Sequence, residues 1–289
     1  IYMALALMVC LFVKWPSLPE LWDGLGNLGE SKGLLSGQPI FPCLFITIAC
    51  GAVSGFHATQ SPMMARCLTD ERLGRPVFYG AMITEGIVAL IWATVSSWFF
   101  FDVVAGLVGA TGSPAVQAVS DKSANGWLGD LGGILAILGV VAAPITSGDT
   151  AFRSARLIVA DFLHLNQKPV ANRLMISIPL FLSAGVLLWY NIADENGFNV
   201  IWRYFGWANQ TLAVFMLWTA TAYLVKFMKG LTYLITMIPA AFMTAVCTTY
   251  ICVAKIGLGL PDSWNRAIGL ATFVVSLVVF YILYFRCRK

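Results

Sequence analysis

The sequence predicts an all-α protein, a polytopic bundle of transmembrane helices, and three observations lead to that fold class. Hydrophobic residues make up 59% of the 289 residues and charged residues only 11%, whereas soluble domains carry about a quarter charged residues. The hydrophobic residues form runs of about 20 residues, the length that crosses the hydrocarbon core as a helix. The charged residues gather in the segments between those runs. Lipid is therefore the expected solvent for most of the chain.

About eight membrane spans are expected within a single transmembrane domain, residues 1–289. Residues 39–58 qualify as a span despite a polar end. Residues 1–13 are typical of the last part of a helix that begins before Ile1. The sequence also begins without a Met, so we expect the chain to be the C-terminal part of a longer protein. We expect residues 1–13 to be a truncated first span and not a signal peptide, because a signal peptide would need a basic start and a cleavage site. The other predicted spans are 78–101, 131–148, 174–192, 200–225, 231–254 and 266–285.

The charges of the connecting segments predict how these spans are oriented. Twelve of the 18 basic residues follow alternate spans, and short cytoplasmic loops gather Lys and Arg. The alternation places the C-terminus in the cytoplasm and requires that residues 103–120 form a re-entrant or surface segment. The basic clusters predict contact with lipid head groups, and nothing indicates nucleic-acid binding. The 12 residues are Arg66, Arg72, Arg75, Arg153, Arg156, Lys168, Arg173, Lys226, Lys229, Arg286, Arg288 and Lys289.

The cysteines give no sign of a disulfide framework, a metal site or a cofactor. The seven residues include no C-x-x-C pair and lie mostly inside predicted spans, where free Cys behaves as a small apolar residue. The oligomeric state cannot be inferred from the sequence.

Polar residues at membrane depth begin with the stretch CGAVSGFHATQSP, residues 50–62. On a helix Ser54, His57 and Ser61 would share one face. Glycines and Pro62 favour an interrupted helix, which survives in a membrane only when it is buried in protein or lines a watery cavity. The alternative is close helix packing with hydrogen bonds between helices. We expect Ser54, His57, Thr59, Gln60 and Ser61 to bind substrate.

Two acidic residues are candidates for coupling transport to an ion. Glu85 lies inside a predicted span without a basic residue, so it must be protonated, paired or facing water. Asp149 follows Ser147 and precedes Thr150 in PITSGDTAFRSAR. That segment is typical either of a helix start capped by Thr146 or of the interrupted helices that hold ions in transporters. Glu85, Ser147, Asp149 and Thr150 are the predicted proton or ion coupling residues.

A third polar group occurs in WRYFGWANQTLA, residues 202–213. Asn209 and Gln210 fall inside a predicted span, which voids the glycosylation sequon that Asn209 begins. Amides at this depth either bridge helices or bind a ligand, and we expect Asn209 and Gln210 to bind substrate.

These segments resemble the carbon starvation protein A family of bacterial inner-membrane transporters. The resemblance rests on FPCLFITIACGAVSGFHATQSP at 41–62, YGAMITEGIVALIWA at 79–93, GDTAFRSARLIVADFL at 148–163 and FGWANQTLA at 205–213. It implies uptake of small carbon sources such as pyruvate or short peptides during starvation, by proton symport. Sodium is the alternative coupling ion. It also implies a fold related to the inverted-repeat transporters of amino acids and polyamines.

Two other functions stand beside transport. A membrane sensor or structural subunit would bind a metabolite without moving it. An intramembrane hydrolase with Ser54 and His57 as a dyad is disfavoured, because two residues three apart on one helix make a poor dyad and the spacing is G-x-x-S-G. The chain is therefore expected not to be an enzyme.

Overall fold

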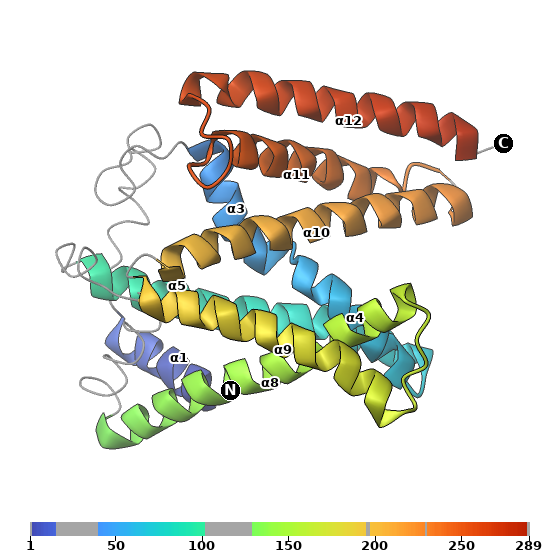
Figure 1. Ribbon diagram of the computed structural model, residues 1–289. Coiled ribbons are helices and arrows are strands. Elements are labelled where there is room, and N and C mark those ends of the chain that lie inside the picture. Colours follow the sequence, from blue (N-terminus) through green and yellow to red (C-terminus); the bar gives the residue numbers. More distant parts are fainter. Residues whose placement is uncertain (1, 16–39, 102–128, 195–196, 229, 288–289) are drawn as a thin grey trace. The chain divides into compact units, whose positions relative to one another are not determined.

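The computed structural model describes residues 2–15, 40–101, 129–194, 197–228 and 230–287. Regular secondary structure within these ranges is entirely helical, which confirms the all-α prediction (Figure 1). The long helices are α1 (Tyr2–Lys14), α3 (Ile40–Ala52), α4 (Gly55–Cys67), α5 (Ala81–Phe101), α8 (Gly129–Phe162), α9 (Val170–Ala193), α10 (Gly197–Phe227), α11 (Leu234–Val253) and α12 (Asn265–Cys287). Short turns of other helix types are η2 (Glu71–Leu73), η3 (Arg75–Gly80) and η5 (Asp262–Trp264).

Within the part of the chain that the structure describes, four helical segments are long and apolar enough to cross a membrane. They are Glu71–Val95, Val170–Ala193, Leu234–Val253 and Asp262–Tyr284. The count of about eight spans and the inverted-repeat fold remain predictions. The segment expected not to cross, residues 103–120, lies outside the described residues.

The predicted span 39–58 is wrong as one continuous helix. Helix α3 ends at Ala52 and α4 begins at Gly55, so the chain bends at Val53 and leaves helical structure at Ser54. The interruption suggested by the glycines is therefore present. It leaves the carbonyl end of one helix facing the amide end of the next.

Both expectations for the backbone around Asp149 are wrong. Helix α8 runs without a break from Gly129 to Phe162, so residues 146–150 neither start nor interrupt a helix. The hydroxyl of Thr150 donates to the carbonyl of Thr146 at 2.9 Å, and Asp149 pairs with Arg153 one turn further on, at 3.0 Å. These polar side chains therefore bond within a continuous helix instead of capping a helix end.

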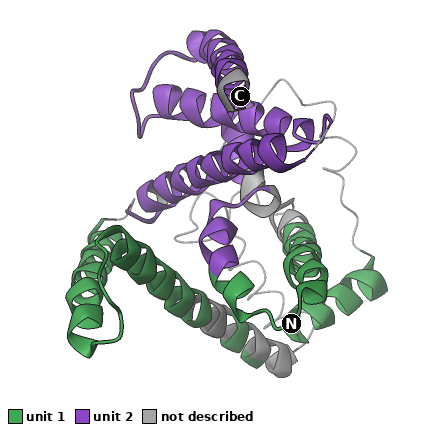
Figure 2. Cartoon of the chain, turned by 90° about the vertical axis from the view of Figure 1, so that its right-hand side faces the viewer, with its two compact units in different colours: residues 1–37, 63–195 green, residues 38–62, 196–289 purple. Residues whose placement is uncertain are grey.

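The described chain divides into two compact units, shown in green and purple in Figure 2. Unit 1 comprises residues 1–37 and 63–195, and unit 2 comprises residues 38–62 and 196–289. The single domain that the sequence predicts for residues 1–289 stays a prediction. In unit 1, α1 packs on α5 through a cluster that includes Leu7 and Val95, both fully buried, while α8 and α9 form a helical hairpin.

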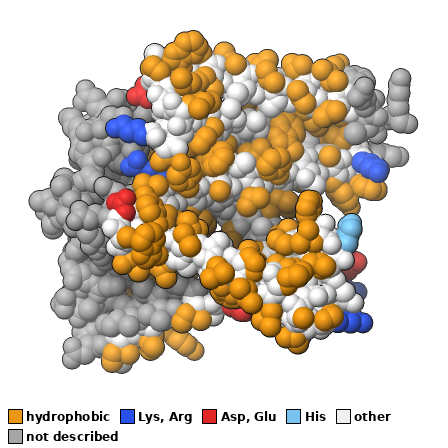
Figure 3. All heavy atoms as spheres, in the orientation of Figure 1, with side chains coloured by type: hydrophobic (Ala, Val, Ile, Leu, Met, Phe, Trp, Pro, Cys, Tyr) orange, Lys and Arg blue, Asp and Glu red, His pale blue; other side chains and the backbone are white. Residues whose placement is uncertain are grey.

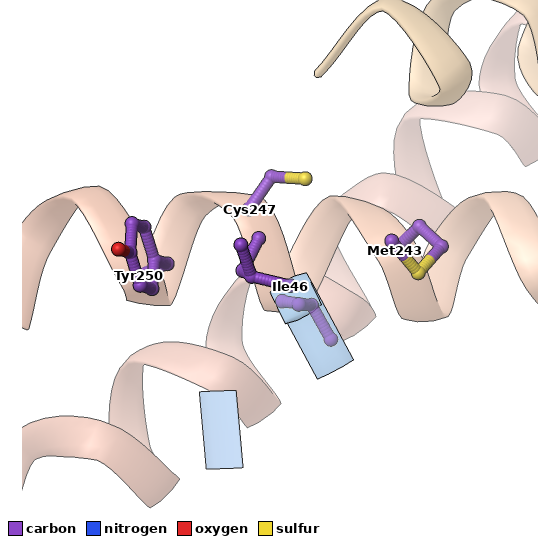
Figure 4. Close-up of a cluster of buried hydrophobic side chains, with 5 residues drawn as sticks. Ile46, Met243, Cys247 and Tyr250 are labelled. Atoms are coloured by element: carbon purple, nitrogen blue, oxygen red, sulfur yellow. The ribbon is translucent and has the colours of Figure 1, made fainter. Parts of the chain in front are cut away.

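Unit 2 is built on α11, which packs against α10, α12 and α3. Ile46 of α3 lies against Met243, Cys247 and Tyr250 of α11 in its largest buried cluster (Figure 4). Fully buried Ala240 and other small residues of α11 let the neighbouring helices approach closely. This packing fixes α10 and α3 on one scaffold.

Large apolar side chains cover much of the surface of the described residues. Hydrophobic side chains predominate on the face in Figure 3, and Ile192 of α9 is 77% exposed and Leu270 of α12 is 68% exposed. A soluble monomer rarely exposes continuous apolar surface on this scale. The outward apolar residues are consistent with helices that face lipid.

A buried hydroxyl pair between α10 and α11 gives a first prediction. Thr221 Oγ donates to the Leu217 carbonyl at 2.7 Å and lies 2.9 Å from Thr236 Oγ. We expect Thr221→Val, which keeps the shape and removes both bonds, to lower the free energy of unfolding by only about 0.6 kcal/mol, since such bonds in membranes are weak. Reversible SDS unfolding in mixed micelles measures this value. A loss above about 2 kcal/mol would show that the hydroxyl pair contributes more than such bonds usually do.

Candidate functional site

The break between α3 and α4 forms the centre of the candidate site in unit 2. Val53 and Ser54 separate the two helices. The first amides of α4 begin a new helix and carry the positive end of its dipole. Buried side chains of α10 lie directly against this end of α4.

Asn209 of α10 caps the start of α4 from outside the helix. Its side-chain oxygen accepts a hydrogen bond from the backbone N–H of Phe56 at 2.8 Å and a second from the hydroxyl of Ser54 at 3.3 Å. Only 4% of the Asn209 surface is exposed. A buried amide that accepts from an otherwise unsatisfied helix N–H removes a desolvation cost of about 1–3 kcal/mol. Asn209 thus holds the break in its observed geometry.

Gly55 allows this close approach. A β-carbon at residue 55 would collide with the carbonyl oxygen of Asn209 and the side chain of Leu212, and would lie 2.9 Å from the backbone N of Ala213. All three are backbone atoms or a β-carbon fixed to the backbone, so they cannot move aside by a rotamer change. The residue type at position 55 therefore determines how near α4 comes to α10.

The other predicted substrate residues of α4 follow on its first two turns. Thr59 Oγ donates to the Phe56 carbonyl and Ser61 Oγ to the His57 carbonyl, both at 2.7 Å. These hydroxyl protons are used within the helix, so each hydroxyl offers a ligand its oxygen as acceptor. His57 and Gln60 are partly buried, and the rings of Phe56 and His57 meet edge to face at 6.3 Å.

Gln210 is fully buried, directly after Asn209 on α10. The structure therefore brings Ser54, the start of α4 and the Asn209 amide to one place, although Asn209 is about 150 positions away in sequence. Asn209 thus bridges two helices, which is one of the two roles that the sequence leaves open for it.

Ser54 donates its hydroxyl proton to Asn209. A serine nucleophile would instead donate that proton to its general base. The observed bond is one of the contacts that hold the helix break.

The predicted coupling residues belong to unit 1. Glu85 and Ser147 are exposed, on α5 and α8. Asp149 forms its ion pair with Arg153, and both side chains are more than half exposed. The predicted coupling residues and the predicted substrate-binding residues therefore belong to different units.

Sequence reasoning missed several residues of α10 and α11. Trp207 of α10 donates its indole N–H to the Cys247 carbonyl at 3.1 Å, and a cavity of about 160 Å³ beside it is lined partly by Thr211, Thr244 and Thr248. Thr244 and Thr248 lie four residues apart on α11, a signal that was available in the sequence. Among the described residues, no three His, Cys, Asp or Glu side chains are grouped to hold a metal ion.

Comparison with known proteins identifies one family. The family model described as "Carbon starvation protein CstA" matches residues 2–131 and 125–250. An uncharacterized protein of Haemophilus influenzae is 47% identical over 131 residues, which cover 45% of this chain and 88% of that protein. No solved structure matches the chain.

Two relatives carry functional names. The "Peptide transporter CstA" of Bacillus subtilis is 27% identical over 279 residues, covering 83% of this chain and 46% of the relative. The "Pyruvate/proton symporter BtsT" of Escherichia coli is 44% identical over 86 residues, covering 29% of this chain and 11% of the symporter. The chain thus spans less than half the length of either named transporter.

Proposed function

The chain belongs to the carbon starvation protein CstA family, and from this premise we propose that it forms part of a secondary active transporter of the bacterial inner membrane. The proposed substrates are small carbon sources, pyruvate or short peptides, because the named relatives are a peptide transporter and a pyruvate/proton symporter. A proton is the proposed coupling ion and sodium the alternative. In the proposed orientation the C-terminus lies in the cytoplasm.

The observation that carries this proposal is the break at Val53 and Ser54 beside buried amides of α10. Non-helical backbone at membrane depth is tolerated where it is buried in protein or lines a cavity. Discontinuous helices whose amide ends point at an anionic substrate are typical of secondary transporters. Both pyruvate and peptides carry a carboxylate, which suits the positive end of α4.

In the proposed site the residues divide into positioning and binding groups. Asn209 fixes the first turn of α4 through Phe56. A substrate carboxylate then binds at that turn, where the dipole favours negative charge. The proposed substrate-binding residues are Ser54, His57, Thr59, Gln60, Ser61, Asn209 and Gln210.

Uptake by proteoliposomes that contain the full chain tests this function. With acid outside, labelled pyruvate is expected to accumulate inside and to leak out when a protonophore collapses the pH difference. A sodium gradient that drives uptake without a pH difference would support sodium coupling instead. Tight pyruvate binding without any flux would favour the sensor and contradict transport.

Glu85 gives a sharper prediction within the same assay. One pH unit is worth about 1.4 kcal/mol per proton, so a symporter that carries one proton with pyruvate accumulates it about tenfold per unit. We expect Glu85→Gln, which removes the ionisable group from α5, to abolish this accumulation while pyruvate exchange at equal pH continues. Glu71→Gln, in the exposed turn η2, is the matched control and should accumulate pyruvate normally.

Unchanged accumulation by Glu85→Gln would exclude Glu85 as the proton carrier. Asp149, with Ser147 and Thr150 on either side of it, is the other proposed coupling site. Its carboxylate pairs with Arg153 at 3.0 Å.

A further inference from the structure

A basic cavity lies between α8 and α9, within the hairpin of unit 1. It has a volume of about 430 Å³. Its α8 wall carries Asp149, Phe152, Arg153 and Arg156, which share one helix face at i, i+3, i+4 and i+7. Its α9 wall carries Arg173, Ser177 and Phe181, again on one face. The cavity is therefore built by two facing stripes of side chains.

The charges in this cavity do not balance. Asp149 is its one acidic side chain and pairs with Arg153 at 3.0 Å. Arg156 and Arg173 remain as two guanidinium groups without a carboxylate in the cavity lining. Within the described residues, the Nε atoms of both are shielded from solvent and have no hydrogen-bond acceptor. Arg173 Nη2 donates to the Lys168 carbonyl at the long distance of 3.5 Å.

A buried N–H without an acceptor costs about 1–3 kcal/mol, and more when it is charged. Two such donors on facing walls of one cavity therefore indicate an acceptor that the protein does not supply. The start of α9 adds to the positive field, because its N-cap residue Pro169 makes no side-chain capping bond and the helix begins at Val170, three residues before Arg173.

The cavity changes from charged to apolar along its length. The rings of Phe152 and Phe181 lie 4.6 Å apart. Phe152 is one turn, about 6 Å, from Arg156 along α8, on the side away from the loop that joins the helices. Phe181 is 57% exposed, so the apolar end opens onto the outer surface of the hairpin. A ligand that fits both ends has an anionic head and an apolar tail.

We propose that this cavity binds a phosphate anion, and that the head group of an anionic phospholipid supplies it. A phosphodiester offers two non-bridging oxygens beside its ester oxygens, so two arginine forks can bind it at once. The phenylalanine end matches acyl chains. In the proposed orientation the cavity faces the cytoplasmic leaflet, where basic pockets between helices bind lipid head groups. This proposal does not depend on transport or on its substrate.

The test is isothermal titration calorimetry, in which short-chain phosphatidylglycerol is added to the full chain in detergent and the heat of binding gives the affinity. We expect the double variant Arg156→Gln, Arg173→Gln to bind at least about tenfold more weakly, since it removes the charge-assisted hydrogen bonds of both guanidinium groups. The matched control is Lys255→Gln, Arg266→Gln, which removes the same charge from exposed positions outside the basic clusters and should bind normally. Circular dichroism checks that both variants remain helical.

Separate arms identify the source of the phosphate. Weak binding of short-chain phosphatidylcholine and of inorganic phosphate would support the lipid head group. Competition by inorganic phosphate at equal affinity would support the phosphate site but overturn its assignment to lipid. Equal affinity for phosphatidylcholine, equal loss in the control variant, or full competition by pyruvate would overturn the proposal.

If the double variant does not fold, the single variant Arg156→Lys keeps the charge and removes the planar fork. Weaker binding of phosphatidylglycerol by this variant would support the proposed site, since lysine cannot make two parallel bonds to one phosphate. Unchanged binding would contradict it.

Discussion

Gly55→Ala is expected to lower the free energy of unfolding by about 3 kcal/mol, the upper part of the usual range for overpacking, and to abolish pyruvate uptake. The added β-carbon would collide with the carbonyl oxygen of Asn209 and with Leu212, and would lie 2.9 Å from the Ala213 backbone. Helices α4 and α10 must then separate. That separation breaks the 2.8 Å bond between Phe56 and Asn209, so both the packing and the helix break are lost.

Reversible SDS unfolding, followed by the fluorescence of the chain's 10 tryptophans, measures this effect. Gly86→Ala is the matched control: Gly86 is also helical, and a β-carbon there meets no atom within 4 Å. We expect the control to unfold at the same or slightly higher denaturant, because alanine favours helix by about 1 kcal/mol over glycine. Equal stability of the two variants would show that α4 does not depend on close contact with α10.

Asn209→Leu is expected to be the second most damaging substitution. It leaves the N–H of Phe56 and the hydroxyl of Ser54 without the oxygen that both now use. Each buried donor left unsatisfied costs about 1–3 kcal/mol, so we expect stability to fall by about 2–4 kcal/mol and uptake to be lost. Unfolding in SDS and pyruvate uptake are the two measurements.

Asn209→Asp separates capping from the other properties of this residue. Aspartate keeps an acceptor at the same place and is as good an N-cap as asparagine, so it should restore part of the lost stability. If aspartate proves as damaging as leucine, the side-chain oxygen is not what matters at this position. If leucine itself is tolerated, Asn209 does not hold the break.

Much of the fold could be predicted from composition and hydrophobic runs. Each predicted span other than 39–58 falls mainly on one helix, because a run of about 20 apolar residues has few stable alternatives in lipid, where every backbone group must be satisfied internally. Helix ends were less predictable. Span 131–148 continues to Phe162 as part of α8, since polar residues such as Asp149 and Arg153 pair with each other within the helix.

The candidate site was predicted in part. The glycines and polar residues at 50–62 indicated an interruption, and the structure places one at Val53 and Ser54. The partner of that interruption could not be predicted, because the hydrogen bond between Phe56 and Asn209 joins residues 153 positions apart. Arg173 was assigned only to orientation and general contact with lipid head groups, since nothing local shows that it faces Arg156 across a cavity.

The sequence by itself determined that the chain is helical, suited to lipid, and interrupted near residue 54, because these properties depend on composition and on neighbours along the chain. The tertiary structure decided which side chains of separate helices contact or face one another. Asn209 caps α4 and Arg156 faces Arg173 because separate helices pack side by side, and a single sequence does not encode those distances in any local pattern.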